Sequence, residues 1–234
     1  MRGREARGRD RASRCVEVSA MVTRLLYLTR HAEQDLSGLN GSTAEEPDTG
    51  LSERGRQQAT LLGERLRGRR FAAVHHGPLR RAAQTAELIA KSLPDVPVYE
   101  TELAGDHLPH DTDPTGLPPA YATFLAQFSA AQRVDGPQVT AAAVRRFAGP
   151  ATEATAGDEP VRELVVTHTF LIGWLVRHAL DAPEQRWLGL NLHNAGLTVI
   201  RYSPSGPPNL IAVNDVAHLP AELRATGLPP DYLV

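Results

Sequence analysis

Two apolar runs of the sequence each end in a histidine. The run LLYLTRH ends in Arg30 and His31, and the run ELVVTH ends in His168. Near neutral pH an unprotonated imidazole is available as a nucleophile, whereas a serine or a lysine must first lose a proton. An arginine does not lose its charge, so Arg30 at the end of a buried strand needs an anion or a carboxylate beside it. The neighbouring Glu33 could supply that carboxylate in an ordinary ion pair, which is the structural alternative to an anion site.

Two further arginines stand at the start of a predicted helix. In GPLRRAAQTAELIAK, Pro78 marks the helix start and places Arg80 and Arg81 in the first turn, where the helix dipole disfavours cations. Arg80 shares a polar stripe with Gln84 and Glu87, and Arg81 lies off that stripe. We therefore expect Arg80 to be solvated and Arg81 to turn toward the sheet.

Together these side chains indicate a pocket for a phosphoryl group. Forked, charge-assisted contacts from Arg30 and Arg81 suit the oxygens of a dianion. A neutral histidine beside them could take the phosphoryl group and form a phosphohistidine. Fixed donors of this kind can replace the metal that many phosphoryl-transfer enzymes use, so we expect no metal and no cofactor.

Strand and helix signals alternate along the chain. This order implies an α/β three-layer sandwich with a mainly parallel central sheet covered by helices on both faces. Ligands of such sheets bind at the carboxyl ends of the strands, so His31 and His168 should reach the same edge. Ser52 is the expected N-cap of the first helix. The predicted strands are residues 22–29, 71–76, 96–101 and 162–167, with 196–202 and 209–215 as additional edge strands. The predicted helices are residues 52–68, 78–92, 119–130, 138–148 and 170–180, and the Pro-rich segment 105–119 is expected to be an irregular loop.

Length and composition argue against several classes of protein. The chain has 234 residues and a formal net charge of −2, which gives no field that would favour nucleic acid or an anionic membrane. No apolar run approaches the roughly 18 residues needed to span a bilayer. The single cysteine, Cys15, cannot form an internal disulfide and fits a reducing compartment, so a cytoplasmic location is expected.

The organisation along the chain is expected to be simple. Residues 1–20 are rich in arginine and lack an apolar segment, so they are not a secretory signal and are expected to be a disordered leader. Residues 21–234 are expected to form a single catalytic domain, a size that one hydrophobic core can support. The oligomeric state is not readable from the sequence.

Four separated motifs resemble those of the histidine phosphatase superfamily, also called phosphoglycerate mutase-like. LTRHAE resembles its Arg-His-Gly signature, with Ala32 in the glycine position. LSERGRQQATLLGERL resembles the helix that follows, GPLRRAAQTAELIA resembles the second-arginine motif, and LVVTHTFLI resembles the segment of the second histidine. The motifs follow the family's order over residues 22–180, so the resemblance implies a phosphoglycerate mutase-like fold.

The resemblance also implies a role for each matching residue. His31 would be the nucleophile, and Arg30 and Arg81 would clamp the phosphate, with His168 and the adjacent Thr169 completing the phosphate pocket. The implied activity is that of a metal-independent phosphomonoesterase acting through a phosphohistidine. Its substrate would be a phosphorylated small molecule or a phosphoprotein.

The tail of the sequence narrows the match, whereas the general acid departs from the pattern. VRHALDAPEQRWLGLNLHNAGLTVIRYS is similar to the branch that contains the mitochondrial serine/threonine protein phosphatase. That branch carries a glutamate directly before a glycine after the third strand, but here Ala104 precedes Gly105. Glu102 is therefore our predicted general acid, with Asp106 as the substitute.

Two other functions remain open at this point. A mutase would transfer the phosphoryl group between two hydroxyls, and a binding module would hold phosphorylated ligands without turnover. A metal site in HLPHDTDP is a weaker hypothesis, because its spacing matches no reliable ligand motif. The residues concerned are His107, His110, Asp111 and Asp113.

Overall fold

The computed structural model describes residues 21–37, 48–152, 159–229 and 232. The expected leader, residues 1–20, and Cys15 within it lie outside the described residues. The strands are β1 (Arg24–Arg30), β2 (Ala73–His76), β3 (Val98–Glu100), β4 (Val161–Thr167), β5 (Leu197–Tyr202) and β6 (Asn209–Asp215). The helices are α1 (Glu53–Leu66), α2 (Arg80–Ala90), α3 (Pro119–Leu125), α4 (Ala130–Phe147) and α5 (Thr169–Ala179), with short 3-10 turns at Glu102–Ala104, Glu184–Gly189 and Ala221–Leu223.

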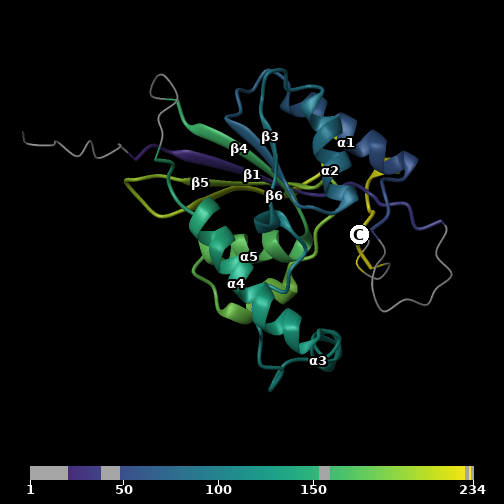
Figure 1. Cartoon of the computed structure of the whole chain (residues 1–234), viewed down its shortest axis with the longest axis vertical. Helices are drawn as coiled ribbons and strands as arrows, with labels where there is room; N and C mark the ends of the chain where they lie inside the picture. The colour runs from purple at the N-terminus through teal and green to yellow at the C-terminus, as the bar shows by residue number, and fades with distance from the viewer. Residues whose placement is uncertain (1–20, 38–47, 153–158, 230–231, 233–234) are drawn as a thin grey trace, which may run out of the picture.

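The strands form one six-stranded sheet in the order β3-β2-β4-β1-β5-β6. Strands β3, β2, β4 and β1 run parallel to one another, and β5 runs antiparallel to both β1 and β6. Helices α1 and α2 lie on one side of the sheet, and α4 and α5 lie on the other (Figure 1). The predicted three-layer α/β sandwich with a mainly parallel sheet is confirmed.

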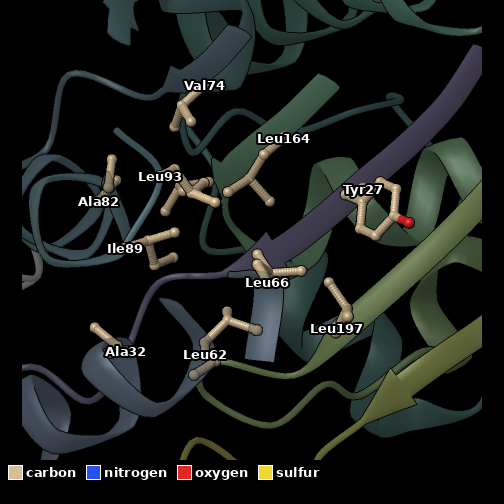
Figure 2. Packing of buried hydrophobic residues seen from close by; sticks show 14 of the residues in the cluster. Tyr27, Ala32, Leu62, Leu66, Val74, Ala82, Ile89, Leu93, Leu164 and Leu197 are labelled. Atoms are coloured by element: carbon tan, nitrogen blue, oxygen red, sulfur yellow. The ribbon is translucent and has the colours of Figure 1, made fainter. Parts of the chain in front are cut away.

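Each face of the sheet has its own hydrophobic core. On one face, Leu62 and Leu66 of α1 and Ile89 of α2 are fully buried against the strands, as Figure 2 shows. On the other face, Phe147 of α4 and Ile172 of α5 pack against the buried side chains of β1, β4 and β5. With both faces covered, polar side chains on the central strands are either buried or confined to the strand ends.

The start of α1 matches the sequence prediction. Ser52 is the N-cap, and its hydroxyl accepts a hydrogen bond from the Gly55 amide at 3.0 Å. A side chain at Gly55 would collide with the backbone carbonyl of Glu33, so the glycine allows α1 to lie against the loop that follows β1. This close approach fixes the loop that carries His31.

The start of α4 differs from the prediction. We expected a helix over residues 138–148, but α4 begins at Ala130 and runs through Pro137. A capping box explains the earlier start, since Ser129 and Gln132 each satisfy the other's backbone amide at this end. The capping box therefore starts the helix a full two turns before the proline.

A third, smaller cluster of apolar residues lies away from the sheet. Leu108 from the loop after β3 and Leu125 of α3 are buried with Trp187, and α3 stands at the foot of the view in Figure 1. The rings of Phe124 and Phe170 contact Trp187 with centroids 6.4 and 5.4 Å away, and Phe128 packs edge-on against Phe124 at 5.3 Å. We call residues 105–128 the cap, because this packing holds them above the carboxyl edge of the sheet.

A buried ion network joins the amino-terminal halves of β1 and β4 to His75 of β2 and to α4. We call it the Glu163 cluster; it comprises Arg24, His75, Arg146 and Glu163. The carboxylate oxygens of Glu163 lie 3.1 Å from Arg24 Nε, 2.5 Å from Arg146 Nη2 and 3.3 Å from His75 Nε2. These contacts hold the pKa of Glu163 down to about 2 against the opposing effect of its burial.

Among the described residues, no helix is long and apolar enough to cross a bilayer.

Candidate active site

The two histidines predicted to meet do lie side by side at the carboxyl edge of the sheet. His31 follows β1 and His168 follows β4, and these strands are parallel neighbours. Their rings are 5.0 Å apart between centroids, and both side chains are almost fully buried. The strand ends therefore deliver both imidazoles into one enclosed place.

The hydrogen bonds of His31 fix its tautomer. Its Nδ1 lies 2.8 Å from the Ala32 carbonyl, which can only accept, so Nδ1 carries the proton. Nε2 accepts a hydrogen bond from Arg81 Nε at 3.2 Å. Burial, followed by His168 and by the charges of Arg30 and Arg81, lowers the pKa of His31 well below its ordinary value. His31 is thus a neutral imidazole with its Nε2 lone pair directed at the arginine.

Arg81 occupies the place that the stripe argument predicted. It is only 2% exposed, whereas Arg80 is exposed and donates its backbone amide to Asp48 at 2.7 Å. Thr85 fixes the geometry one turn later: its hydroxyl donates to the Arg81 carbonyl at 2.6 Å and accepts from the Ala32 amide at 3.0 Å. The first turn of α2 and the loop after β1 are therefore tied together through one hydroxyl.

Arg30 is oriented by the C-terminal part of the chain. Its Nη1 donates to the carbonyls of Leu192 at 2.7 Å and Gly227 at 2.6 Å. The same C-terminal segment is anchored to α1, because Gln58 Nε2 donates to the Leu223 carbonyl and to the Thr226 hydroxyl, both at 2.8 Å. Residues 223–227 therefore form one wall beside Arg30.

The acid nearest to this group is Asp106. Its Oδ2 lies 3.1 Å from Arg81 Nη2 and 3.3 Å from His168 Nδ1. Glu102, our first choice from the sequence, is 71% exposed in its side chain, with Oε2 3.8 Å from Nε2 of His107. The turn Glu102–Ala104 directs Glu102 outward, and the chain after Gly105 returns Asp106 to the arginine. Burial raises the pKa of Asp106 above its ordinary value, although the charge of Arg81 opposes the shift.

His168 has a buried Nε2 that hydrogen-bonds to no polar group of the described residues, and its Nδ1 has only the 3.3 Å contact with Asp106. Within the described part of the chain, neither Nδ1 nor Nε2 makes a hydrogen bond, although the ring is 2% exposed. Burial, with Arg81 and Arg30, lowers its pKa well below the ordinary value. His168 is also the N-cap of α5, so Thr169 and the free amides of the first turn lie next to it. Buried polar atoms without partners indicate a site built for a ligand.

Several supporting residues were not found by sequence reasoning. Asn194 Nδ2 donates to the His31 carbonyl at 2.9 Å from the turn before β5. Gln58 Oε1 accepts from the Glu33 amide at 2.9 Å. The Glu33 carboxylate, which the sequence offered to Arg30, accepts from the Ser52 hydroxyl at 2.7 Å and pairs with Arg54 at 3.4 Å. A buried glutamine at helical spacing in α1 was the available signal for this second layer of contacts.

The residues of the weaker metal hypothesis are spread over separate contacts in the cap. His110 stacks on Trp174 with ring centroids 5.4 Å apart and lies 3.2 Å from Glu184. Asp111 pairs with Arg133 at 2.6 Å. The described residues contain no group of three or more His, Cys, Asp or Glu side chains arranged to hold a metal ion. These contacts hold the cap against α4 and α5.

Comparison with known proteins identifies relatives over most of the chain. The sequence model of the histidine phosphatase superfamily, branch 1, matches residues 26–216. The rat mitochondrial serine/threonine-protein phosphatase PGAM5 is 29% identical over 213 residues, which are 90% of this chain and 69% of the rat protein. The human counterpart is 28% identical over the same length.

Solved structures show the same fold. Bacillus stearothermophilus YhfR superposes with a TM-score of 0.63 at 25% identity, covering 83% of this chain and 98% of its own. Phosphoglycerate mutase from Plasmodium falciparum superposes with a TM-score of 0.54 at 20% identity, covering 86% of this chain and 96% of the other. The phosphoglycerate mutase-like architecture expected from the motifs is confirmed.

One expectation is contradicted by the comparisons. The sequence led us to expect a cytoplasmic location, chiefly from its cysteine usage. The rat, mouse and human relatives are all named as mitochondrial proteins, so that expectation is wrong. Cysteine usage reports on redox conditions and does not separate one reducing compartment from another.

Proposed function

The chain belongs to the histidine phosphatase superfamily, and we propose that it is a phosphomonoesterase that works through a phosphohistidine on His31. The observation that carries the proposal is the pair of neutral, buried imidazoles enclosed by two arginines. Cations concentrated beside uncharged rings leave a net positive pocket that suits a dianionic phosphoryl group. The relatives named as serine/threonine-protein phosphatases support the same class of reaction.

The first chemical step forms a bond between His31 and phosphorus. Nε2 carries the lone pair, because Nδ1 donates to the Ala32 carbonyl. As the ester P–O bond breaks, Arg30, Arg81 and His168 hold the non-bridging oxygens. Before the attack, substrate binding makes Arg81 exchange its hydrogen bond to His31 for bonds to the phosphoryl oxygens, which frees the Nε2 lone pair.

The departing oxygen takes a proton from Asp106. A carboxylic acid can donate only while it is protonated, and burial favours that form by raising the pKa of Asp106. In the second step water attacks phosphorus, Asp106 takes back a proton, and the N–P bond breaks to release phosphate and neutral His31. The proposal therefore assigns the acid and base roles to Asp106 in place of Glu102.

The substrate is proposed to be a phosphate monoester on a small molecule or a protein. Specificity would depend on the cap, because the loop that places Asp106 continues directly into it. A mutase would need the phosphohistidine to be shielded from water while the product turns around. A binding module would have no need of a neutral histidine beside the phosphate or of an acid with a raised pKa, so catalysis is favoured.

The test is phosphate release from p-nitrophenyl phosphate with a chelator present, comparing the natural protein with His31→Ala. The proposal expects release that survives chelation and is absent from His31→Ala. Rapid acid-labile labelling of the natural protein from a radioactive phosphate ester would identify the intermediate. Transfer of phosphate to a second hydroxyl without free phosphate would indicate the mutase, and tight phosphate binding without hydrolysis would indicate the binding module.

A further inference from the structure

A separate cavity lies at the edge of the sheet opposite the catalytic residues. Its volume is about 780 Å³, within the range of small-molecule sites. Phe71 and Ala72 precede β2, Val96 precedes β3, and Arg162 lies at the start of β4. The cavity therefore opens at the amino ends of strands whose carboxyl ends carry the catalytic loops.

The floor of this cavity is apolar. Phe71 and Leu93 are largely buried there, and Pro94 and Val96 continue the surface toward solvent. Phe71 is held in place by an edge-on contact with Tyr27, with ring centroids 5.0 Å apart. An organic ring or short chain could lie on such a floor and remove apolar surface from water.

The rim of the cavity is strongly basic. Four arginines line it against two acids, so its net charge is +2, whereas the whole chain carries −2. Arg162 Nη1 lies 3.5 Å from Glu159 in an exposed pair. The other acid is Asp95, and the other arginines are Arg67, Arg69 and Arg70.

Those three arginines have no counter-charge of their own. All are exposed, and their guanidinium groups make no hydrogen bond or ion pair with any described residue. Arg67 caps the end of α1, where the helix dipole favours a cation. Arg69 and Arg70 lie beyond the helix, after the turn at Gly68 with φ of +78°, so the dipole does not account for them.

We propose that this cavity binds a small amphiphilic anion, with an apolar ring or chain on the floor and a phosphate or sulfonate group held by Arg69 and Arg70. The forked guanidinium groups of arginines form paired hydrogen bonds with such anions. An anion bound between two arginines also offsets the repulsion between their charges. This second site is distinct from the catalytic pocket, where phosphate would be enclosed among buried side chains. It does not depend on the proposed function.

The test uses 8-anilinonaphthalene-1-sulfonate, an aromatic sulfonate, as the probe. Fluorescence titration of the natural protein should show one saturable site, and binding should weaken as salt is raised. The double variant Arg69→Glu/Arg70→Glu should bind the probe roughly tenfold more weakly or worse, because attraction becomes repulsion. The matched control Arg56→Glu/Arg186→Glu changes the net charge equally at exposed positions outside the cavity and should bind as the natural protein does.

Two further measurements keep the result specific. His31→Ala should bind the probe unchanged, and Arg69→Glu/Arg70→Glu should keep its thermal unfolding temperature and its hydrolysis of p-nitrophenyl phosphate. Absence of saturable binding would overturn the proposal. Equal binding by both double variants, or loss of binding in His31→Ala, would also overturn it by placing the probe elsewhere.

Discussion

The protein contains two clusters built from the same residue types at opposite ends of one sheet. At the amino end, the Glu163 cluster combines two arginines, a histidine and a carboxylate; at the carboxyl end, the catalytic group combines two arginines, two histidines and Asp106. Strand β1 supplies an arginine to each, Arg24 at its start and Arg30 at its end. Their chemistry differs because their charges are balanced differently.

In the Glu163 cluster one carboxylate is shared by two guanidinium groups. Glu163 stays ionised with a pKa of about 2, and Arg24 also donates to the carbonyls of Arg146 and Phe147, both at 2.8 Å. In the catalytic group Asp106 has a raised pKa, and the buried nitrogens of His168 lack hydrogen bonds from the described residues. A cluster whose charges pair with one another is structural, and one that leaves a buried Nε2 without a partner can bind a ligand.

The largest expected effect separates the two carboxylates at the catalytic end. Asp106→Asn should lower kcat on an alkyl phosphate by on the order of 10² to 10⁴, because the poor leaving group then departs without a proton. The loss should be much smaller with p-nitrophenyl phosphate, whose phenolate leaves readily. Glu102→Gln is the matched control and should retain nearly full rate in steady-state assays; a reversed result would return the acid role to Glu102.

The pH profile sharpens the same assignment. Because the proton donor must be protonated, kcat on an alkyl phosphate should fall as pH rises through the raised pKa of Asp106. The lowered pKa of His31 keeps the nucleophile neutral on the acid side of pH 7. Asp106→Asn should remove the decline toward high pH; an unchanged decline would assign it to another group.

The second prediction breaks the Glu163 cluster. Glu163→Gln leaves the buried Arg24 and the half-buried Arg146 without their carboxylate, which should lower the free energy of unfolding by about 3 kcal/mol. Urea denaturation measures this change, and the turnover of the folded fraction should stay the same. The control Glu159→Gln removes an exposed pair and should change stability by about 1 kcal/mol or less. Equal effects of the two substitutions would refute the structural role.

Acid should weaken the Glu163 cluster with a defined sign. The folded pKa of Glu163 lies near 2, below the ordinary value of 4.5, so its contribution is complete above pH 4.5 and is lost as pH falls toward 2. A shift of this size corresponds to about 3 kcal/mol. Stability measured against pH should decline over that window in the natural protein and decline less in Glu163→Gln.

The smallest effect concerns the histidine of the Glu163 cluster. His75→Gln should cost about 1 kcal/mol in urea denaturation, since it removes a contact at 3.3 Å from a carboxylate that keeps two arginines. His75 lies in the carboxyl-terminal half of β2, so contact with substrate is the alternative to this structural role. An unchanged kcat/KM in His75→Gln would exclude contact between His75 and the substrate. A tenfold loss of kcat/KM would contradict a purely structural role for His75 in the Glu163 cluster.

Sequence reasoning succeeded where the regular repeat of a strand or helix determines which way a side chain points. The ends of two predicted parallel strands placed His31 and His168 at one edge, and the helical stripe separated Arg81 from Arg80. Their distances apart in sequence did not matter, because strand and helix geometry transmit position over long range. The family motifs agreed with this geometry at each of these residues.

Sequence reasoning could not predict which way a side chain points from an irregular loop, or which distant residue pairs with a polar side chain in a strand. Glu102 and Asp106 are four residues apart in an irregular segment, and only the turn between them decides which one faces Arg81. Glu163 sits among apolar strand residues, and nothing local identifies Arg146, in a helix, as its partner. The free hydrogen-bonding capacity of a site is likewise a property of the folded contacts.

The contacts of residues 223–227 have a consequence for biosynthesis. Arg30 gains its Gly227 acceptor, and Gln58 gains Leu223 and Thr226, only after all five strands from β2 to β6 have been made. A nascent chain still attached to the ribosome at β5 therefore carries His31 without the wall that orients its arginine. The contacts that orient Arg30 and anchor residues 223–227 are therefore among the last to form during synthesis.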